Sequence, residues 1–165
     1  MNAMKKILAF ALAGVMALAL LTGCGTGGSA SHKSIAKAMA DYDNGQHLKT
    51  TITCTSSAVL DAKLQELAAK TEFENVVKAV YNGQSPTIPA GVLPTNKVVY
   101  LYCGKYDKDA GKQAINLNAH PVCIAPTSTS SLADERQIGL ITTSFTDTNG
   151  KKVKVRFAVV VSPKP

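Results

Sequence analysis

Cysteine thiols are the most reactive groups in this sequence, and their spacing limits the chemistry they can perform. The chain has four of them, Cys24, Cys54, Cys103 and Cys123. No two lie two to four residues apart, so the sequence has neither a Cys-x-x-Cys redox pair nor a zinc-finger spacing. Cys103 and Cys123 stand at opposite ends of one excursion of the chain, as cross-strand neighbours would. Of the three single bridges that Cys54, Cys103 and Cys123 allow, we expect Cys103–Cys123, with Cys54 a buried thiol.

Other nucleophiles and general bases do not form a recognisable catalytic motif. Ser34-Ile35-Ala36-Lys37 has the Ser-x-x-Lys spacing of penicillin-recognising enzymes, but the companion Ser-Asp-Asn and Lys-Thr-Gly motifs are missing. The three histidines have no nucleophile or carboxylate at motif spacing. Asp107 to Gly111 starts like a calcium-binding loop, yet Asn118 stands where a bidentate glutamate is needed. We therefore expect a protein that is not an enzyme and that holds no metal or cofactor.

The N-terminal segment has the pattern of an export signal. Lys5 and Lys6 precede fifteen residues, Ile7 to Leu21, without a charged or strongly polar side chain. This length is typical of the apolar core of a signal peptide and is short for a membrane-spanning helix. We therefore expect residues 1–23 to be a signal peptide that is removed on export.

The end of this apolar run resembles the lipobox of bacterial lipoproteins. Leu21 is aliphatic, Thr22 and Gly23 are small, and Cys24 carries the thiol that can accept a lipid. The resemblance implies that a diacylglyceryl group is attached to the Cys24 sulfur and that cleavage makes Cys24 the new N-terminus. It covers this segment only and assigns no family to the rest of the chain.

A lipidated Cys24 predicts where the protein resides. Two acyl chains anchor a protein durably without a spanning helix, since each buried methylene contributes about 0.8 kcal/mol. The Gly- and Ser-rich sequence that follows favours a flexible tether over residues 24–33 and one folded domain over residues 34–165. We expect a protein on the extracytoplasmic face of the cell membrane, or in an outer membrane if the organism has one.

Positive charge is concentrated near the C-terminal end of the sequence. Residues 24–147 hold eleven basic and eleven acidic side chains, whereas residues 148–165 hold five basic and no acidic ones. Four of these lie in the expected last hairpin: Lys151, Lys152, Lys154 and Arg156. One hypothesis is contact with an anionic partner such as phospholipid headgroups, a wall polymer or another protein. The alternative is the solvated face of an edge strand that lysines keep from aggregating. Nucleic acid is not expected, because aromatic side chains are not interleaved with these charges.

Helical patterns cover the first half of the expected domain. Ser34 can cap a short helix over residues 35–42, and Ser56 and Ser57 can start a longer helical pattern. The apolar stripe of this longer pattern changes direction part-way, and one straight helix cannot bury both stripes against one sheet. Thr71-x-x-Glu74 is a capping box at the join, so we predict two helices, over residues 58–70 and 72–81.

Strand patterns dominate the second half. Apolar and β-branched alternation predicts strands over residues 49–55, 97–103, 114–119, 122–124, 137–146 and 152–162. A proline-containing loop is expected over residues 84–96, and residues 147–150 have the composition of a hairpin turn. The inward positions of the final strand are Val153, Val155, Phe157, Val159 and Val161. The fold class that follows is α+β, an antiparallel sheet of four to five strands with helices packed on one face.

Two functions from different classes fit these observations. The first is a non-enzymatic, membrane-tethered binding or assembly domain, which fits the lipobox resemblance, the single small domain and the local basic face. The second rests on a resemblance of residues 67–83, and of the strand-rich part after Pro86, to the globular half of type IV pilin-like proteins. That resemblance implies a subunit or minor component of a surface filament or secretion system, although pilins keep their apolar N-terminal helix and this chain has a lipobox instead. A small extracytoplasmic enzyme is the least favoured hypothesis.

Overall fold

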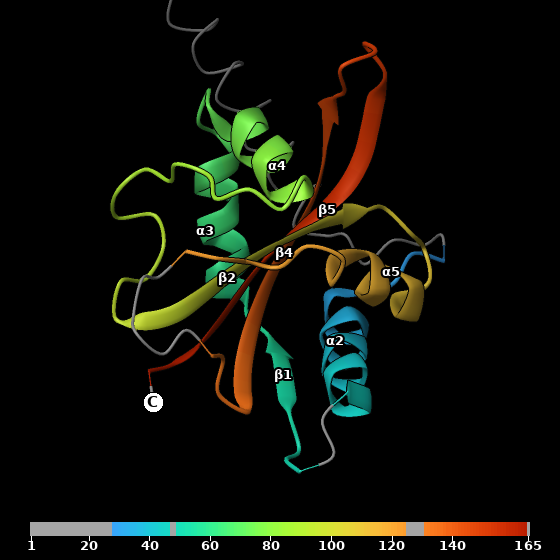
Figure 1. Cartoon of the computed structure of the whole chain (residues 1–165), viewed down its shortest axis with the longest axis vertical. Helices are drawn as coiled ribbons and strands as arrows, with labels where there is room; N and C mark the ends of the chain where they lie inside the picture. Colours follow the sequence, from blue (N-terminus) through green and yellow to red (C-terminus); the bar gives the residue numbers. More distant parts are fainter. Residues whose placement is uncertain (1–27, 47–48, 125–130, 165) are drawn as a thin grey trace, which may run out of the picture.

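The elements of this computed structural model lie within residues 28–46, 49–124 and 131–164, which are the residues that the structure describes (Figure 1). Helices and strands follow one another in an order that mixes both types. In chain order they are α2 (His32–Gln46), β1 (Thr53–Ser56), α3 (Ala58–Ala68), α4 (Phe73–Tyr81), β2 (Lys97–Lys105), α5 (Ala110–Leu117), β3 (Val122–Cys123), β4 (Glu135–Thr146) and β5 (Lys152–Pro163).

β5 is the central strand of a five-stranded sheet with the order β1-β4-β5-β2-β3. It pairs antiparallel with β4 on one side and with β2 on the other, so that Val159 lies between Gly139 and Leu101. β2 pairs antiparallel with β3, whereas the short edge strand β1 pairs parallel with β4. The expected α+β class is confirmed, and the sheet differs from a purely antiparallel one in this single edge pair.

Helices cover both faces of the sheet (Figure 1). α3 and α4 pack on the face that contains Val155, Phe157 and Val159, whereas α2 and α5 pack on the face that contains Ala158 and Val160. All five of these side chains are buried. In the second half of β5, the side chains on both faces of the strand are therefore apolar, as is typical of a strand covered on two sides. The expectation placed all helices on one face, and the structure places two on each.

The break between α3 and α4 occurs where the change in apolar direction predicted it. The same core contains the buried leucines of α3 and the buried Phe73 and valines of α4. The turn between the two helices therefore brings both apolar stripes onto this core, whereas a single straight helix would point them in different directions. The expected capping box is not formed, because the N-cap position is Glu72. Glu74 Oε1 instead accepts a hydrogen bond from Thr146 N at 2.9 Å, which lowers the pKa of this carboxyl and joins α4 to the end of β4.

Two glycines allow helices to approach the sheet closely. A Cβ on Gly139 would lie 2.5 Å from Leu60 Cβ in α3, and a Cβ on Gly104 would lie 2.4 Å from the Asn116 carbonyl carbon in α5. Neither distance can be accommodated without movement of the helix. One glycine thus sets the spacing of the helix layer on each face of the sheet.

Two predicted strands are corrected by the structure. Residues 114–119 were expected as a strand, but helix α5 occupies most of this segment, because Asp109 Oδ1 accepts from Lys112 N at 2.8 Å and caps it. The strand expected over residues 49–55 starts only at Thr53. The backbone of Ile52 bonds to the Asn44 side chain in α2 instead of to a neighbouring strand.

Candidate functional site

The residues just before α2 are bound to the far end of the chain. Arg156 Nη2 on β5 donates hydrogen bonds to Ser29 Oγ at 2.8 Å and to the Ala30 carbonyl oxygen at 3.2 Å. Ser29 Oγ also bonds the Tyr106 hydroxyl at 2.8 Å, and Ala30 N donates to the Lys108 carbonyl oxygen at 2.9 Å. We call Ser29, Ala30, Tyr106 and Arg156 the N-terminal clamp. Residues 29–33 were expected in the tether, and the structure instead makes them part of the fold.

One hypothesis included Arg156 in a surface that contacts an anionic partner, and its burial contradicts that assignment. Its residue is only 3% exposed, and its guanidinium carbon lies 5.0 Å from the centre of the Tyr106 ring. Burial lowers the pKa of this guanidinium below its ordinary value. Nε is also buried and has no hydrogen-bond partner among the described residues. The physical reason is that Arg156 lies where β5 is flanked by both β2 and β4 and is covered by Tyr106. The alternative of a solvated edge strand is therefore wrong for Arg156, whereas Lys152 lies beyond the end of the β2 pairing and is exposed.

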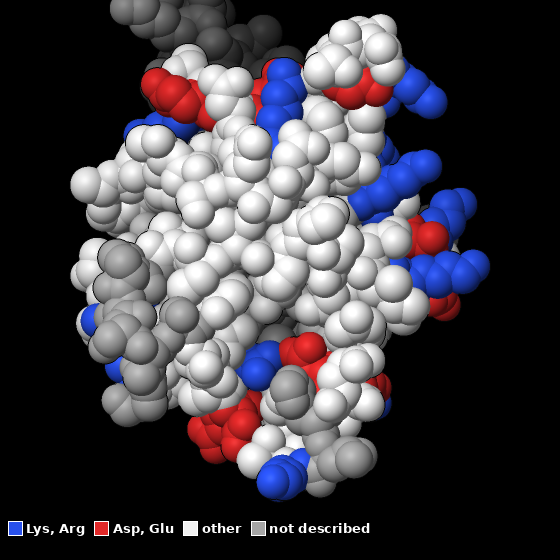
Figure 2. All heavy atoms as spheres, viewed as in Figure 1, with Lys and Arg blue, Asp and Glu red and all other residues white. Residues whose placement is uncertain are grey.

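The lysines of the last hairpin remain exposed and are joined by others from the end of β2. Lys154 Nζ lies 4.0 Å above the Tyr106 ring, and Tyr106 N donates to the Lys154 carbonyl oxygen at 3.0 Å. We define the basic edge by its five exposed lysines: Lys105, Lys108, Lys151, Lys152 and Lys154. Figure 2 shows basic side chains gathered along the right-hand side of the molecule, over the β4–β5 hairpin and α5, with acidic groups between them. The clamp and the basic edge therefore occupy the same end of the sheet.

The predicted lipid-attachment residue and its lipobox lie outside the described residues. These positions are Leu21, Thr22, Gly23 and Cys24. In the sequence only four residues, 25–28, separate Cys24 from Ser29 of the clamp. Among the described residues, no helix has the length and hydropathy needed to cross a membrane.

The expected Cys103–Cys123 disulfide is not formed. The β2–β3 register places Cys123 opposite Tyr100, which is three residues from Cys103 along β2. That offset separates the two Cα atoms by about 10 Å along the strand, beyond the reach of a disulfide. The odd offset also directs the two side chains to opposite faces of the sheet. Cys103 is a free thiol that is buried in the α3–α4 core, and this burial raises its pKa to about 12.

Cys54 lies beside an ion pair, Arg136 and Asp43, that also lines a polar cleft. Arg136 Nη1 is paired with Asp43, and Arg136 Nε donates to the Ala133 carbonyl oxygen at 2.9 Å. The cleft has a volume of about 360 Å³, and Tyr102 forms part of its wall. Burial raises the pKa of the Cys54 thiol to about 12 and also raises the pKa of the Tyr102 hydroxyl. Both groups are protonated at neutral pH, which leaves neither as a nucleophile or general base.

His32 makes a contact that no sequence motif indicated. Its Nδ1 lies 3.0 Å from Asp61 Oδ2, and Asp61 Oδ1 accepts from Leu140 N at 2.8 Å. The carboxylate thus links the start of α2 to α3 and β4. Asp61 stands 29 residues beyond His32, so its partner could not be found from spacing. The pair has a structural role, because the other oxygen of the Asp61 carboxylate already accepts a hydrogen bond from the β4 backbone.

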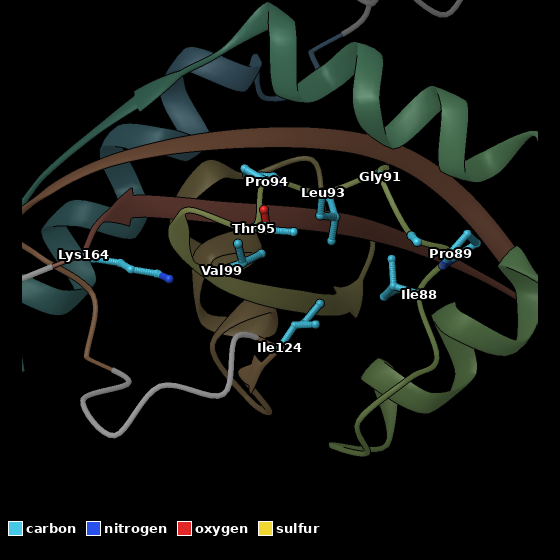
Figure 3. Close-up of a pocket in the computed structure, with 10 residues that line it drawn as sticks. Ile88, Pro89, Gly91, Leu93, Pro94, Thr95, Val99, Ile124 and Lys164 are labelled. Carbon is cyan, nitrogen blue, oxygen red and sulfur yellow. The ribbon is translucent and has the colours of Figure 1, made fainter.

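An apolar pocket lies at the end of the sheet opposite the clamp (Figure 3). Its volume is about 270 Å³. It lies between the loop that precedes β2 and the face of β2, and Ile124 closes one side. The lining residues are Ile88, Pro89, Ala90, Gly91, Leu93, Pro94, Thr95, Val99, Ile124 and Lys164. The prolines of this loop predicted it from the sequence, but the pocket could not be predicted, because the path of the loop across β2 depends on distant contacts.

No protein-family model matches this chain, and searches of curated proteins and of solved structures find no match. Within the described residues, no group of three or more His, Cys, Asp or Glu side chains is arranged to hold a metal ion. The candidate functional features are therefore the clamp with its basic edge at one end of the sheet and the apolar pocket at the other.

Proposed function

We propose that this protein is a membrane-anchored extracytoplasmic lipoprotein whose α+β domain is a non-enzymatic binding domain. The observation that carries the proposal is the position of the clamp. Ser29 and Ala30 are fixed beside the basic edge, and Cys24, the residue that the lipobox resemblance marks for lipidation, precedes Ser29 by only four intervening residues.

The short link constrains how such a domain would sit on a membrane. Five steps of extended chain from Cys24 to Ser29 reach at most about 17 Å. A lipid on Cys24 would thus hold the basic edge near the headgroups of the same bilayer. Each lysine close to an anionic leaflet contributes about 1 kcal/mol to association, and the attraction fades beyond about 8 Å at physiological salt. The basic edge supplies five such lysines.

In this arrangement the apolar pocket would face away from the membrane. β5 begins at the basic edge with Lys152 and ends beside the pocket at Pro163, and this run extends about 36 Å. Figure 1 places the C-terminal end of β5 on the opposite side of the sheet from the start of α2. One end would serve attachment and the other would present a ligand site to the surroundings.

Binding is favoured over catalysis by the state of the reactive groups. The thiols of Cys54 and Cys103 have pKa values raised to about 12 by burial, which disfavours the nucleophilic thiolate. The histidine–carboxylate pair of His32 and Asp61 joins α2, α3 and β4. The pocket itself is lined mainly by aliphatic and proline side chains, which bind apolar groups and transfer no protons.

Metabolic labelling with an alkyne-bearing fatty acid tests the anchor. Labelled protein should fractionate with membranes, and mass spectrometry should place the lipid on a peptide that starts at Cys24. The Cys24→Ala variant should lose the label, while Cys54→Ala should keep it. A protein that starts at Met1 and lacks lipid would refute the proposal.

A further inference from the structure

The pocket at the far end of the sheet has a wall whose parts come from separate segments. Ile88 and Leu93 project from the loop before β2, Val99 projects from β2, and Ile124 follows β3 (Figure 3). Ile124 N donates to the Val99 carbonyl oxygen at 3.0 Å, which fixes these two side chains relative to each other. Ile88, Leu93 and Ile124 are partly buried and pack against the main core, so the pocket continues the interior of the domain.

Backbone restriction keeps the loop side of the pocket open. Pro89 and Pro94 each have a fixed φ, and Gly91 between them adopts a φ of 81°, which favours glycine. Val92 is 7% exposed and inserts into the core, which holds the middle of the loop in place. The backbone of the loop that forms this pocket is thus already restrained. Ligand binding therefore costs little conformational entropy for ordering the loop.

Among the described residues, Lys164 is the one charged side chain that lines this pocket. It follows β5, and Figure 3 shows its amine extended toward Val99. The amine makes no ion pair or hydrogen bond with the described residues. An aliphatic cavity with a single cation at its rim is complementary to a molecule with an apolar body and one negative end.

We propose that this pocket binds a medium-length aliphatic carboxylate, with the chain in the cavity and the carboxylate at Lys164 Nζ. The cavity of about 270 Å³ equals about nine water-sized groups, which suits a chain of roughly eight to ten carbons. The proposal supplies a ligand class for the binding domain proposed above and rests on that function. Binding itself requires no lipid on Cys24, so the two proposals can fail separately.

Decanoate, kept below its micelle concentration, is the probe, and the mature chain from residue 24 with Cys24→Ser is the protein. Amide chemical shifts should move at Ile88, Leu93, Val99 and Ile124, and acetate at the same concentration should move none of them. Decanol carries the chain without the charge. Lys164→Gln should weaken decanoate binding about 2- to 5-fold, as expected for an exposed ion pair, and leave decanol binding unchanged.

Two further variants separate the pocket from general effects of charge and folding. Lys97→Gln removes a lysine at the same end of the sheet that does not line the pocket, and it should leave decanoate affinity unchanged. Leu93→Glu places a like charge in the cavity and should weaken decanoate at least 10-fold, with the amide spectrum outside the loop preserved.

Three results would overturn the proposal. The first is the absence of decanoate-induced shifts at the pocket. The second is an equal effect of Lys164→Gln on decanoate and decanol. The third is tighter binding of an N-acetylated peptide with an aliphatic C-terminal residue, which would assign the pocket to peptide carboxylates instead.

Discussion

The clamp predicts that one buried arginine holds the N-terminal segment to the domain. Replacing Arg156 with Met keeps most of the side chain's length and removes its two hydrogen bonds, to Ser29 Oγ and to the Ala30 carbonyl oxygen. Hydrogen bonds to a charged donor contribute about 1.5–3 kcal/mol each, and contact with the Tyr106 ring adds about 0.5–2 kcal/mol. The buried Nε offsets part of this gain, because an unsatisfied buried donor costs about 1–3 kcal/mol. From the central values of these contributions we expect Arg156→Met to lower the free energy of unfolding by about 3–4 kcal/mol.

A double-mutant cycle with Ser29→Ala tests whether this loss arises at the clamp. Ser29→Ala alone should lower the free energy of unfolding by about 1 kcal/mol, and the coupling between the two substitutions should be about 1 kcal/mol. Chemical denaturation of the mature chain measures both values. Lys154→Met is the matched control, since it removes an exposed cation from the same ring and should change stability by less than about 1 kcal/mol.

The hydrogen-exchange rate of the Ala30 amide gives an independent measure of whether the clamp is closed. This amide donates to the Lys108 carbonyl oxygen and should exchange much faster in Arg156→Met, whereas Lys112 N, bonded to Asp109, should keep its protection. Coupling below about 0.3 kcal/mol, together with an unchanged Ala30 exchange rate, would show that Arg156 does not hold Ser29 and Ala30 to the domain.

Two further predictions concern packing and pH. Gly139→Ala should lower the free energy of unfolding by about 1–3 kcal/mol, because the new Cβ would lie 2.5 Å from Leu60 Cβ. Gly45→Ala should raise the free energy of unfolding by about 0.5–1 kcal/mol, because Gly45 lies in α2 with open space around it. Urea denaturation of both variants checks the sign of each change. The pKa of the Cys103 thiol is raised from 9.0 to about 12 in the fold, so its contribution to stability is complete below pH 9 and is lost as the pH rises toward 12. Each pH unit in that window should reduce the free energy of unfolding by about 1.4 kcal/mol through this thiol, and Cys103→Ala should show a correspondingly shallower decline. An identical pH slope in the variant would contradict this assignment.

Local patterns predicted the parts of the fold that local physics determines. The alternation of β5, the change of apolar direction near Thr71 and the turn at Gly150 each follow from a few neighbouring residues. Helix α5 was missed because its eight residues present only a short apolar stripe, although the Asp109 cap was readable in the sequence. A cap therefore carried more information in this segment than the alternation of its side chains.

The candidate site could not be predicted because its parts meet only in the folded chain. Ser29 and Arg156 are 127 residues apart, so the clamp appears in no local pattern. The basic charge of the last hairpin was visible, but the burial of Arg156 depends on β5 being central and covered by Tyr106. Likewise, the position of Cys123 opposite Tyr100 depends on the β2–β3 register, which the spacing of cysteines does not determine.

Orientation on a bilayer is the most direct test of a lipid-anchored domain with its basic edge at the membrane. In a variant that keeps Cys24 but has Cys54, Cys103 and Cys123 replaced with Ser, a cysteine introduced at an exposed site can carry a donor dye. The two sites are Lys108→Cys and Lys164→Cys, each in the lipidated protein on vesicles of phosphatidylglycerol and phosphatidylcholine with acceptor-labelled headgroups. A domain anchored with its basic edge at the bilayer should give strong energy transfer from residue 108 and weak transfer from residue 164, since the sheet separates these ends by about 30 Å or more. Equal transfer from both sites, or stronger transfer from residue 164, would contradict this orientation.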